Sequence, residues 1–168
     1  MTNWQMYAQV PALAFLKEFD FVNDVFRCVL LDTAYPASAI TSLAHTYYAS
    51  DVASYEISGT NYTTTGKALV NKWMYWNGAT TDWEWRANTL TWTDLGIDVG
   101  TVGSAVIYHA TTDRVIALND LVDKATTGRD AIVEMPTNGI FQIQWRQSSG
   151  AILGMPDMYE EADIVSVI

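Results

Sequence analysis

Hydrophobic and polar residues alternate in short runs through most of the chain after residue 55. The run DWEWRA (82–87) alternates strictly, and GIFQIQW (139–145) alternates an apolar set with a mostly polar one. Further runs are TLTWT (89–93), GSAVIYHA (103–110), RVIALNDLV (114–122) and AIVEM (131–135). A period of two residues is typical of a strand with one face on the core. Short strands between turn residues predict a mainly β fold, an antiparallel β-sandwich or barrel.

Two stretches support more detailed predictions. KALVNKWMYW (67–76) predicts one long strand after a YEIS strand (55–58) and a GTNYTTTG loop (59–66). HATTDRVIA (109–117) predicts a hairpin that turns near Thr111 to Asp113. One face of the long strand would hold alternate residues: Ala68, Val70, Lys72, Met74 and Trp76.

The chain before residue 55 predicts less regular structure. PALAFLKEF (11–19) predicts a short helix, because Pro11 suits the first helical position and apolar residues recur three and four apart. VFRCVLL (25–31) predicts a strand that ends before Asp32, and HTYYASDVASY (45–55) predicts one or two helical turns.

The C-terminal stretch after residue 149 is apolar but not helical. Gly150, Gly154 and Pro156 rule out a long helix, and the apolar residues between them are too many for a free disordered tail. The tail either packs on its own domain or adds a strand to an open sheet edge of a neighbouring subunit. We therefore divide the chain into an N-terminal arm with a short helix (1–24), a β domain (25–149) and an extended apolar C-terminal tail (150–168).

Composition favours protein partners. Charged residues make up 17% of the chain, against about 25% in a typical domain, and seven tryptophans and nine tyrosines are residue types enriched at interfaces. The formal net charge of −10 argues against binding nucleic acid or an anionic membrane surface.

The termini and the single cysteine point to an unsecreted, soluble protein. The N-terminus lacks the basic region of a signal peptide, and no apolar stretch approaches the ~20 residues of a membrane span. Cys28 lies in an apolar strand-like run, which favours a buried structural thiol over a nucleophile.

Catalytic and ligand-binding motifs are not found. His45 and His109 have no Cys or His at metal-ligand spacing, and neither a nucleophile elbow nor a phosphate-binding loop is present. Asp82 and Glu84 lie two apart beside tryptophans. This arrangement suits a sheet wall or interface best, a sugar-binding platform next, and a glycosidase acid pair least. We expect no enzymatic activity, no cofactor and no metal.

The order of segments resembles a group of small structural virion proteins of tailed bacteriophages. The matches are LLDTAY (30–35), EISGTNYTTTGKALVNK (56–72), AVIY (105–108) and NGIF (138–141). The group typically has EVSGTGYTxGGxxLxNK in the second stretch, so Asn61 and Thr65 stand here where glycines are common. The resemblance spans roughly residues 12 to 145, and it implies a structural role in the head, neck or tail of a virion.

These observations together predict a capsid decoration (cement) protein, a homotrimer on the capsid exterior that is made in the host cytoplasm. Its partners would be the major capsid protein or other virion proteins. We also keep two alternatives, a neck, head–tail connector or tail-fibre component, and a carbohydrate-binding β-sandwich. Part of the tryptophans would fill the core and the others would anchor partners. The expected interface residues are Trp73, Trp76, Trp83, Trp85, Trp92, Met155, Met158, Tyr159, Ile164 and Ile168.

Overall fold

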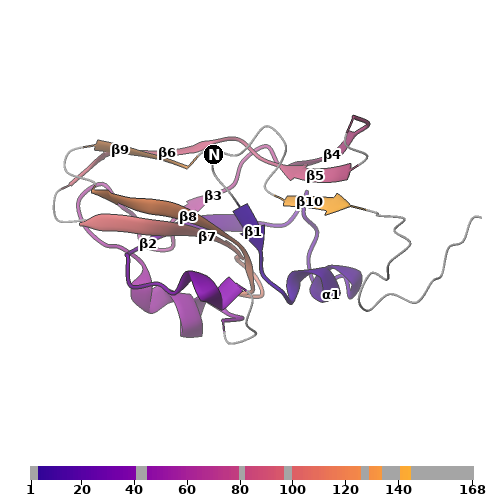
Figure 1. Cartoon of the computed structure of the whole chain (residues 1–168), viewed down its shortest axis with the longest axis horizontal. Coiled ribbons are helices and arrows are strands. Elements are labelled where there is room, and N and C mark those ends of the chain that lie inside the picture. The colour runs from indigo at the N-terminus through magenta and orange to yellow at the C-terminus, as the bar shows by residue number, and fades with distance from the viewer. Residues whose placement is uncertain are drawn as a thin grey trace, which may run out of the picture.

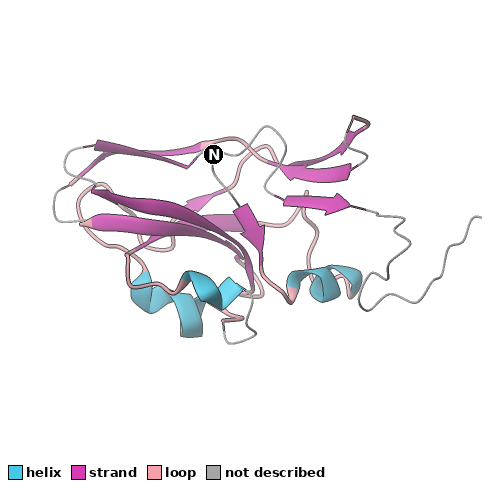
Figure 2. Ribbon diagram, in the orientation of Figure 1, coloured by secondary structure: helices cyan, strands magenta, loops and turns pink. Residues whose placement is uncertain are grey.

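A computed structural model of the chain describes residues 4–40, 45–79, 82–96, 100–125, 129–133 and 141–144. Residues 82, 122–125, 129–132 and 141–144 are described by their backbone only. The described residues are mainly strands in antiparallel sheets (Figures 1 and 2), which confirms the predicted β-rich fold.

The largest sheet has five strands in the order β1-β8-β7-β2-β3. Its strands are β1 (Trp4–Met6), β2 (Phe26–Leu31), β3 (Lys67–Ala68), β7 (Thr101–His109) and β8 (Val115–Ala125). β7 and β8 form the predicted hairpin, and the turn contains Asp113 at a φ of 63°. Aspartate tolerates this left-handed conformation better than most residues, because its short side chain can bond to nearby backbone.

The described part of the N-terminal arm starts with β1 and continues into the predicted helix. β1 pairs with β8 at the edge of the sheet, so this part of the arm belongs to the β structure. Helix α1 (Val10–Phe15) has Pro11 in its first turn. It ends with Lys17 at a φ of 57°, where the amide of Glu18 donates to the carbonyl of Leu13 and that of Lys17 to Ala14. This pair of hydrogen bonds is a Schellman motif, which satisfies the last carbonyls of the helix.

Short helical turns follow β2 and lie along one side of the five-stranded sheet (Figure 2). They are η1 (Ala37–Ile40), η2 (Tyr48–Val52) and η3 (Ala53–Tyr55), and the last two confirm the prediction for residues 45–55. The predicted YEIS strand is reduced to a single bridge between Glu56 and Leu31. Tyr48 of η2 stacks on Tyr108 of β7 with ring centroids 4.1 Å apart, so the turns cover this face of the sheet.

The prediction of one long strand over residues 67–76 is wrong. The chain forms β3 in the large sheet and then β4 (Trp73–Asn77) in a different sheet. Asn71 between them has a φ of 50°, which interrupts the extended backbone. Asparagine adopts this conformation more readily than other residues with a side chain, and the break lets the chain cross from one sheet to the next.

Two smaller sheets complete the described structure. One has three strands in the order β10-β5-β4, with β5 (Asp82–Arg86) and β10 (Phe141–Gln144), and the other pairs β6 (Leu90–Leu95) with β9 (Arg129–Val133). Figure 1 shows β6 and β9 on the side of the large sheet opposite the helical turns. Buried aromatic rings join the layers: Phe26 packs on Trp85 at 5.0 Å, and Tyr62 stacks near Trp92 at 6.3 Å. Cys28 is fully buried in this core, as predicted.

Candidate interaction surface

The strands β4 and β5 expose four large aromatic side chains. We call this pair of strands the tryptophan hairpin. Its exposed residues are Trp73 (39% exposed), Tyr75 (43%), Trp76 (45%) and Trp83 (41%). Figure 1 shows the hairpin at one end of the molecule, extending away from the five-stranded sheet. Clustered exposed aromatics are typical of an interaction site, because water-exposed apolar surface of this kind is costly.

Strand register places the aromatics on both faces of the hairpin. Trp76 pairs with Trp83, and the ring centroids are 5.6 Å apart. Because residues two apart share a face, Trp73 and Tyr75 lie on the other face, where the guanidinium carbon of Arg86 stands 4.2 Å from the centre of the Tyr75 ring. β4 is the last strand in its sheet order, so its outer edge pairs with no strand among the described residues. The hairpin therefore offers two aromatic faces and one edge that is unpaired within the described part of the chain.

Trp85 attaches the base of the hairpin to the core. It is fully buried, and its rings lie 5.0 Å from both Phe21 and Phe26. Its indole nitrogen donates to the carbonyl of Phe21 at 2.9 Å. A buried indole with its N–H satisfied combines a large apolar contact with a fixed orientation, so the direction of the hairpin is set here.

The opposite face of the hairpin base is held by a buried carboxylate. Glu84 is 0% exposed, and it accepts a hydrogen bond from Arg86 Nε at 2.9 Å and another from Asn77 Nδ2 at 2.9 Å. Charge-assisted bonds of this type stabilise a carboxylate that has left water. Glu84 is thus part of the hairpin's internal support, which fits the interpretation of the DWEW run as a sheet wall.

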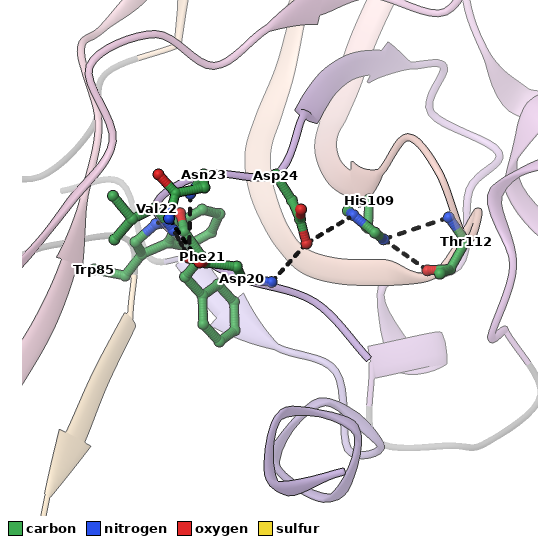
Figure 3. Close-up of polar contacts among 8 residues, drawn as sticks. All are labelled: Asp20, Phe21, Val22, Asn23, Asp24, Trp85, His109 and Thr112. Carbon is green, nitrogen blue, oxygen red and sulfur yellow. Dashed lines mark hydrogen bonds and ion pairs between the residues drawn. The ribbon is translucent and has the colours of Figure 1, made fainter. Parts of the chain in front are cut away.

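The loop between α1 and β2 holds Phe21 in place (Figure 3). Asp20 Oδ1 accepts hydrogen bonds from the amides of Val22 at 2.9 Å and Asn23 at 3.1 Å. The amide of Asp20 donates to Asp24 Oδ2 at 2.6 Å. The Asn23 side-chain amide also donates to Asp20 Oδ2 at 2.7 Å, and this bond, together with the two backbone amide bonds to Oδ1, lowers the pKa of Asp20. The bonds close the loop that presents the Phe21 carbonyl to Trp85.

His109 connects the same loop to the β7–β8 turn. Its Nε2 lies 3.4 Å from Asp24 Oδ2, and its Nδ1 lies 2.7 Å from the Thr112 hydroxyl (Figure 3). Burial lowers the pKa of His109, although Asp24 acts in the opposite direction. The ring is 2% exposed and packs between Phe19 and Phe26. His109 therefore joins the loop before β2 to the β7–β8 turn. His45 bonds to the Tyr35 hydroxyl at 3.1 Å.

The structure brings together three of the predicted interface residues. Trp73, Trp76 and Trp83 lie on the tryptophan hairpin, whereas Trp85 and Trp92 are buried in the core at 0% and 1% exposure. This division accords with the expectation that part of the tryptophans fill the core. Tyr75, which lies between two tryptophans in KWMYW, joins them on the hairpin but is not among the predicted interface residues. The remaining predicted residues, Met155, Met158, Tyr159, Ile164 and Ile168, lie outside the described residues.

Hydrogen bonds hold the EISGTNYTTTG stretch (56–66) against β2 and η2. Glu56 accepts hydrogen bonds from the hydroxyls of Tyr62 (2.7 Å) and Tyr48, and the Tyr62 hydroxyl accepts one from the amide of Leu30. Burial and these bonds to Glu56 raise the pKa of both tyrosines. Arg27 donates to the carbonyls of Thr65 and Gly66 at 2.7 Å. The stretch is therefore hydrogen-bonded to β2 through Arg27 and Leu30.

No protein-family model, curated protein or solved structure matches this chain. Within the described residues, no helix is long and apolar enough to cross a membrane. The same part of the chain contains no group of three or more His, Cys, Asp or Glu side chains placed to hold a metal ion.

Proposed function

We propose that the chain is a structural virion protein, a capsid decoration protein that binds neighbouring capsid subunits through its tryptophan hairpin. The observation that carries the proposal is the set of four exposed aromatics on a hairpin whose base is rigidly attached to the core. Tryptophan and tyrosine dominate the binding energy of many protein interfaces, and rigid placement reduces the entropy lost on binding. The partner would be the major capsid protein or another virion protein.

The resemblance to tailed-bacteriophage virion proteins supports this assignment. In that pattern glycines are common where this chain has Asn61 and Thr65. Both residues have a positive φ here, 63° and 71°, and Gly66 follows at 62°. Glycine adopts such conformations without steric cost, so the backbone geometry accords with the glycine-rich pattern.

We further propose that the sheets form one antiparallel sandwich and that the protein acts as a homotrimer on the capsid exterior. Three copies would present three hairpins, and linked contacts raise the overall affinity well beyond that of one. The tail (150–168) would pack on its own domain or add a strand to a neighbouring subunit. Light scattering of the purified protein tests the trimer, because a monomer at micromolar concentration contradicts it.

The docking role is tested on capsids that lack the protein. Adding the purified chain is expected to raise the temperature at which the capsids lose integrity. The double variant Trp76→Ala/Trp83→Ala is expected to abolish this gain while remaining folded. Tyr47→Ala is the matched control, because Tyr47 is 40% exposed but lies outside the hairpin. Equal protection by the wild type and the double variant would contradict the proposal.

Carbohydrate binding is a second candidate, because Trp83 is exposed and lies beside Trp76. Exposed tryptophan rings can stack on sugar rings, and a glycan on the host surface would then be the ligand. A saturable change in tryptophan fluorescence on adding oligosaccharides, lost in Trp83→Ala, would favour this candidate.

A neck, connector or tail-fibre station in the particle would instead give few copies per virion.

A further inference from the structure

A cavity of about 370 Å³ lies at the C-terminal end of β2, next to Asp32. It is bordered by Asp32, which follows β2, by Gly103 and Ser104 of β7, and by Asp120 of β8. Leu31 pairs with Ser104, and Ser104 pairs with Asp120. The strand register thus brings to one place the Ser104 hydroxyl of β7, the Asp120 carboxylate of β8 and the carboxylate of Asp32, the residue after β2.

Gly103 allows the cavity wall to form. A Cβ at this position would stand 2.8 Å from Thr33 Cα and 2.9 Å from the carbonyl oxygen of Asp32. These distances are shorter than real Cβ contacts, so only glycine lets the Asp32–Thr33 turn approach β7 this closely. The turn is held by the amide of Ala34, which donates to Asp32 Oδ1 at 2.8 Å.

The polar atoms at the cavity are suited to accept hydrogen bonds. Asp32 Oδ2 has no hydrogen-bond or ion-pair partner within the part of the chain that the structure describes. Ser104 is 5% exposed, and its hydroxyl is buried without a hydrogen-bond partner. A buried hydroxyl left unpaired costs free energy, so a ligand that bonds to it gains an interaction that the free protein lacks. Asp120 is exposed, which leaves the cavity reachable from solvent.

The charge and size of the cavity define the class of ligand. Among the described residues that line it there is no Lys, Arg or His, and a chain of net charge −10 attracts cations. A bare Ca²⁺ ion needs six to eight oxygen ligands, but the described residues provide no group of three acidic or other metal-binding side chains. The volume also far exceeds that of one water molecule, about 30 Å³. A larger cation with several N–H donors fits better.

We propose that the cavity bounded by Asp32, Ser104 and Asp120 is a binding site for an organic cation, a guanidinium or primary ammonium group. The two carboxylates accept charge-assisted hydrogen bonds from its N–H groups, and the Ser104 hydroxyl accepts a third. Tyr35 adds an aromatic wall. Such a cation can come from an arginine or lysine of a partner protein or from a free polyamine. This site is separate from the tryptophan hairpin and does not depend on the proposed virion role.

The test is to titrate the ¹⁵N-labelled protein with model ligands at physiological salt and to monitor the amide chemical shifts by NMR. N-acetylarginine amide represents a partner side chain, spermidine represents a free polyamine, and N-acetylcitrulline amide is the uncharged match to arginine. Saturable shifts of the Thr33, Ala34, Gly103 and Ser104 amides with either cation, absent with citrulline, support the site. The cation that binds more tightly identifies the source. Equal shifts with citrulline, shifts with neither cation, or shifts with CaCl₂ alone overturn the proposal.

Variants separate the site from a general effect of charge. Asp32→Asn is expected to weaken cation binding about tenfold, because one charge-assisted contact is lost. Asp94→Asn is the control variant, because it removes one negative charge at an exposed position outside the cavity. Asp94 has a φ of 50°, a conformation that asparagine also tolerates. Asp94→Asn should leave the affinity unchanged. Equal weakening by the two variants would show that only net charge matters and would overturn the site.

Discussion

Thr65 adopts a left-handed conformation that β-branched residues rarely take. Its φ is 71°, while its side chain is exposed and its carbonyl accepts bonds from Arg27 and Tyr108. Thr65→Gly keeps those carbonyl bonds and removes the steric strain, so it should raise the free energy of unfolding by about 1 kcal/mol. Urea unfolding measures the change.

Thr64→Gly is the control variant, because Thr64 is the neighbouring residue in the chain. Thr64 is also exposed but has no positive φ, so Thr64→Gly only adds freedom to the unfolded chain and should destabilise the protein slightly. If both glycine variants lower the free energy of unfolding, the conformation assigned to Thr65 is wrong.

Glu84 supports the tryptophan hairpin from within. Glu84→Gln removes the charge that Arg86 pairs with, and it should lower the free energy of unfolding by about 2 kcal/mol or more. Glu18→Gln breaks a looser pair, since Arg114 Nε lies 3.5 Å from Glu18 and both side chains are partly exposed, so its cost should stay below about 1 kcal/mol. Chemical denaturation of the two variants tests the difference, and equal costs would contradict a structural role for buried Glu84.

The tryptophan hairpin combines a buried base with an exposed outer part. Trp85→Ala empties a core site and should cost about 3 kcal/mol or more. Trp76→Ala and Trp83→Ala remove exposed rings and should each cost less than about 1 kcal/mol. Thermal unfolding of the three variants makes the comparison, and a large loss from Trp76→Ala or Trp83→Ala would mean that these rings belong to the core.

Sequence patterns predicted the elements whose environment is uniform along their length. Residues 103–110 and 114–122 are apolar runs around a turn, and they form β7 and β8. The break at Asn71 was not predicted, because alternation continues across it and only the backbone conformation changes. The burial of Glu84 beside exposed Trp83 was not predicted either. Alternation places Trp83 and Trp85 on one face, but Trp85 is buried because Phe21 and Phe26 pack on it, whereas Trp83 is 41% exposed.

His109 makes the stability of the folded protein depend on pH. Burial lowers its pKa from the ordinary 6.5, so the unfolded chain takes up a proton more readily than the folded one. The free energy of unfolding should therefore fall as the pH drops below about 6.5. Carboxylates with a lowered pKa, such as Asp20, reduce the free energy of unfolding only in more acidic solution, as the pH falls below the ordinary pKa of 3.8.

Unfolding curves between pH 7 and pH 5 test this effect on the wild type and on His109→Gln. The variant removes the titrating group, so its stability should change less over this range even if it is less stable throughout. Parallel curves for the two proteins would show that His109 titrates equally in the folded and unfolded states.

The proposed decoration of a capsid shell requires many copies of the chain on each particle. Its most direct test is the copy number in purified virions, measured by quantitative mass spectrometry against the major capsid protein. We expect a copy number of the same order as that of the capsid subunit. A few copies per particle would contradict decoration and favour a neck or tail station, and absence from the particle would contradict the virion role itself.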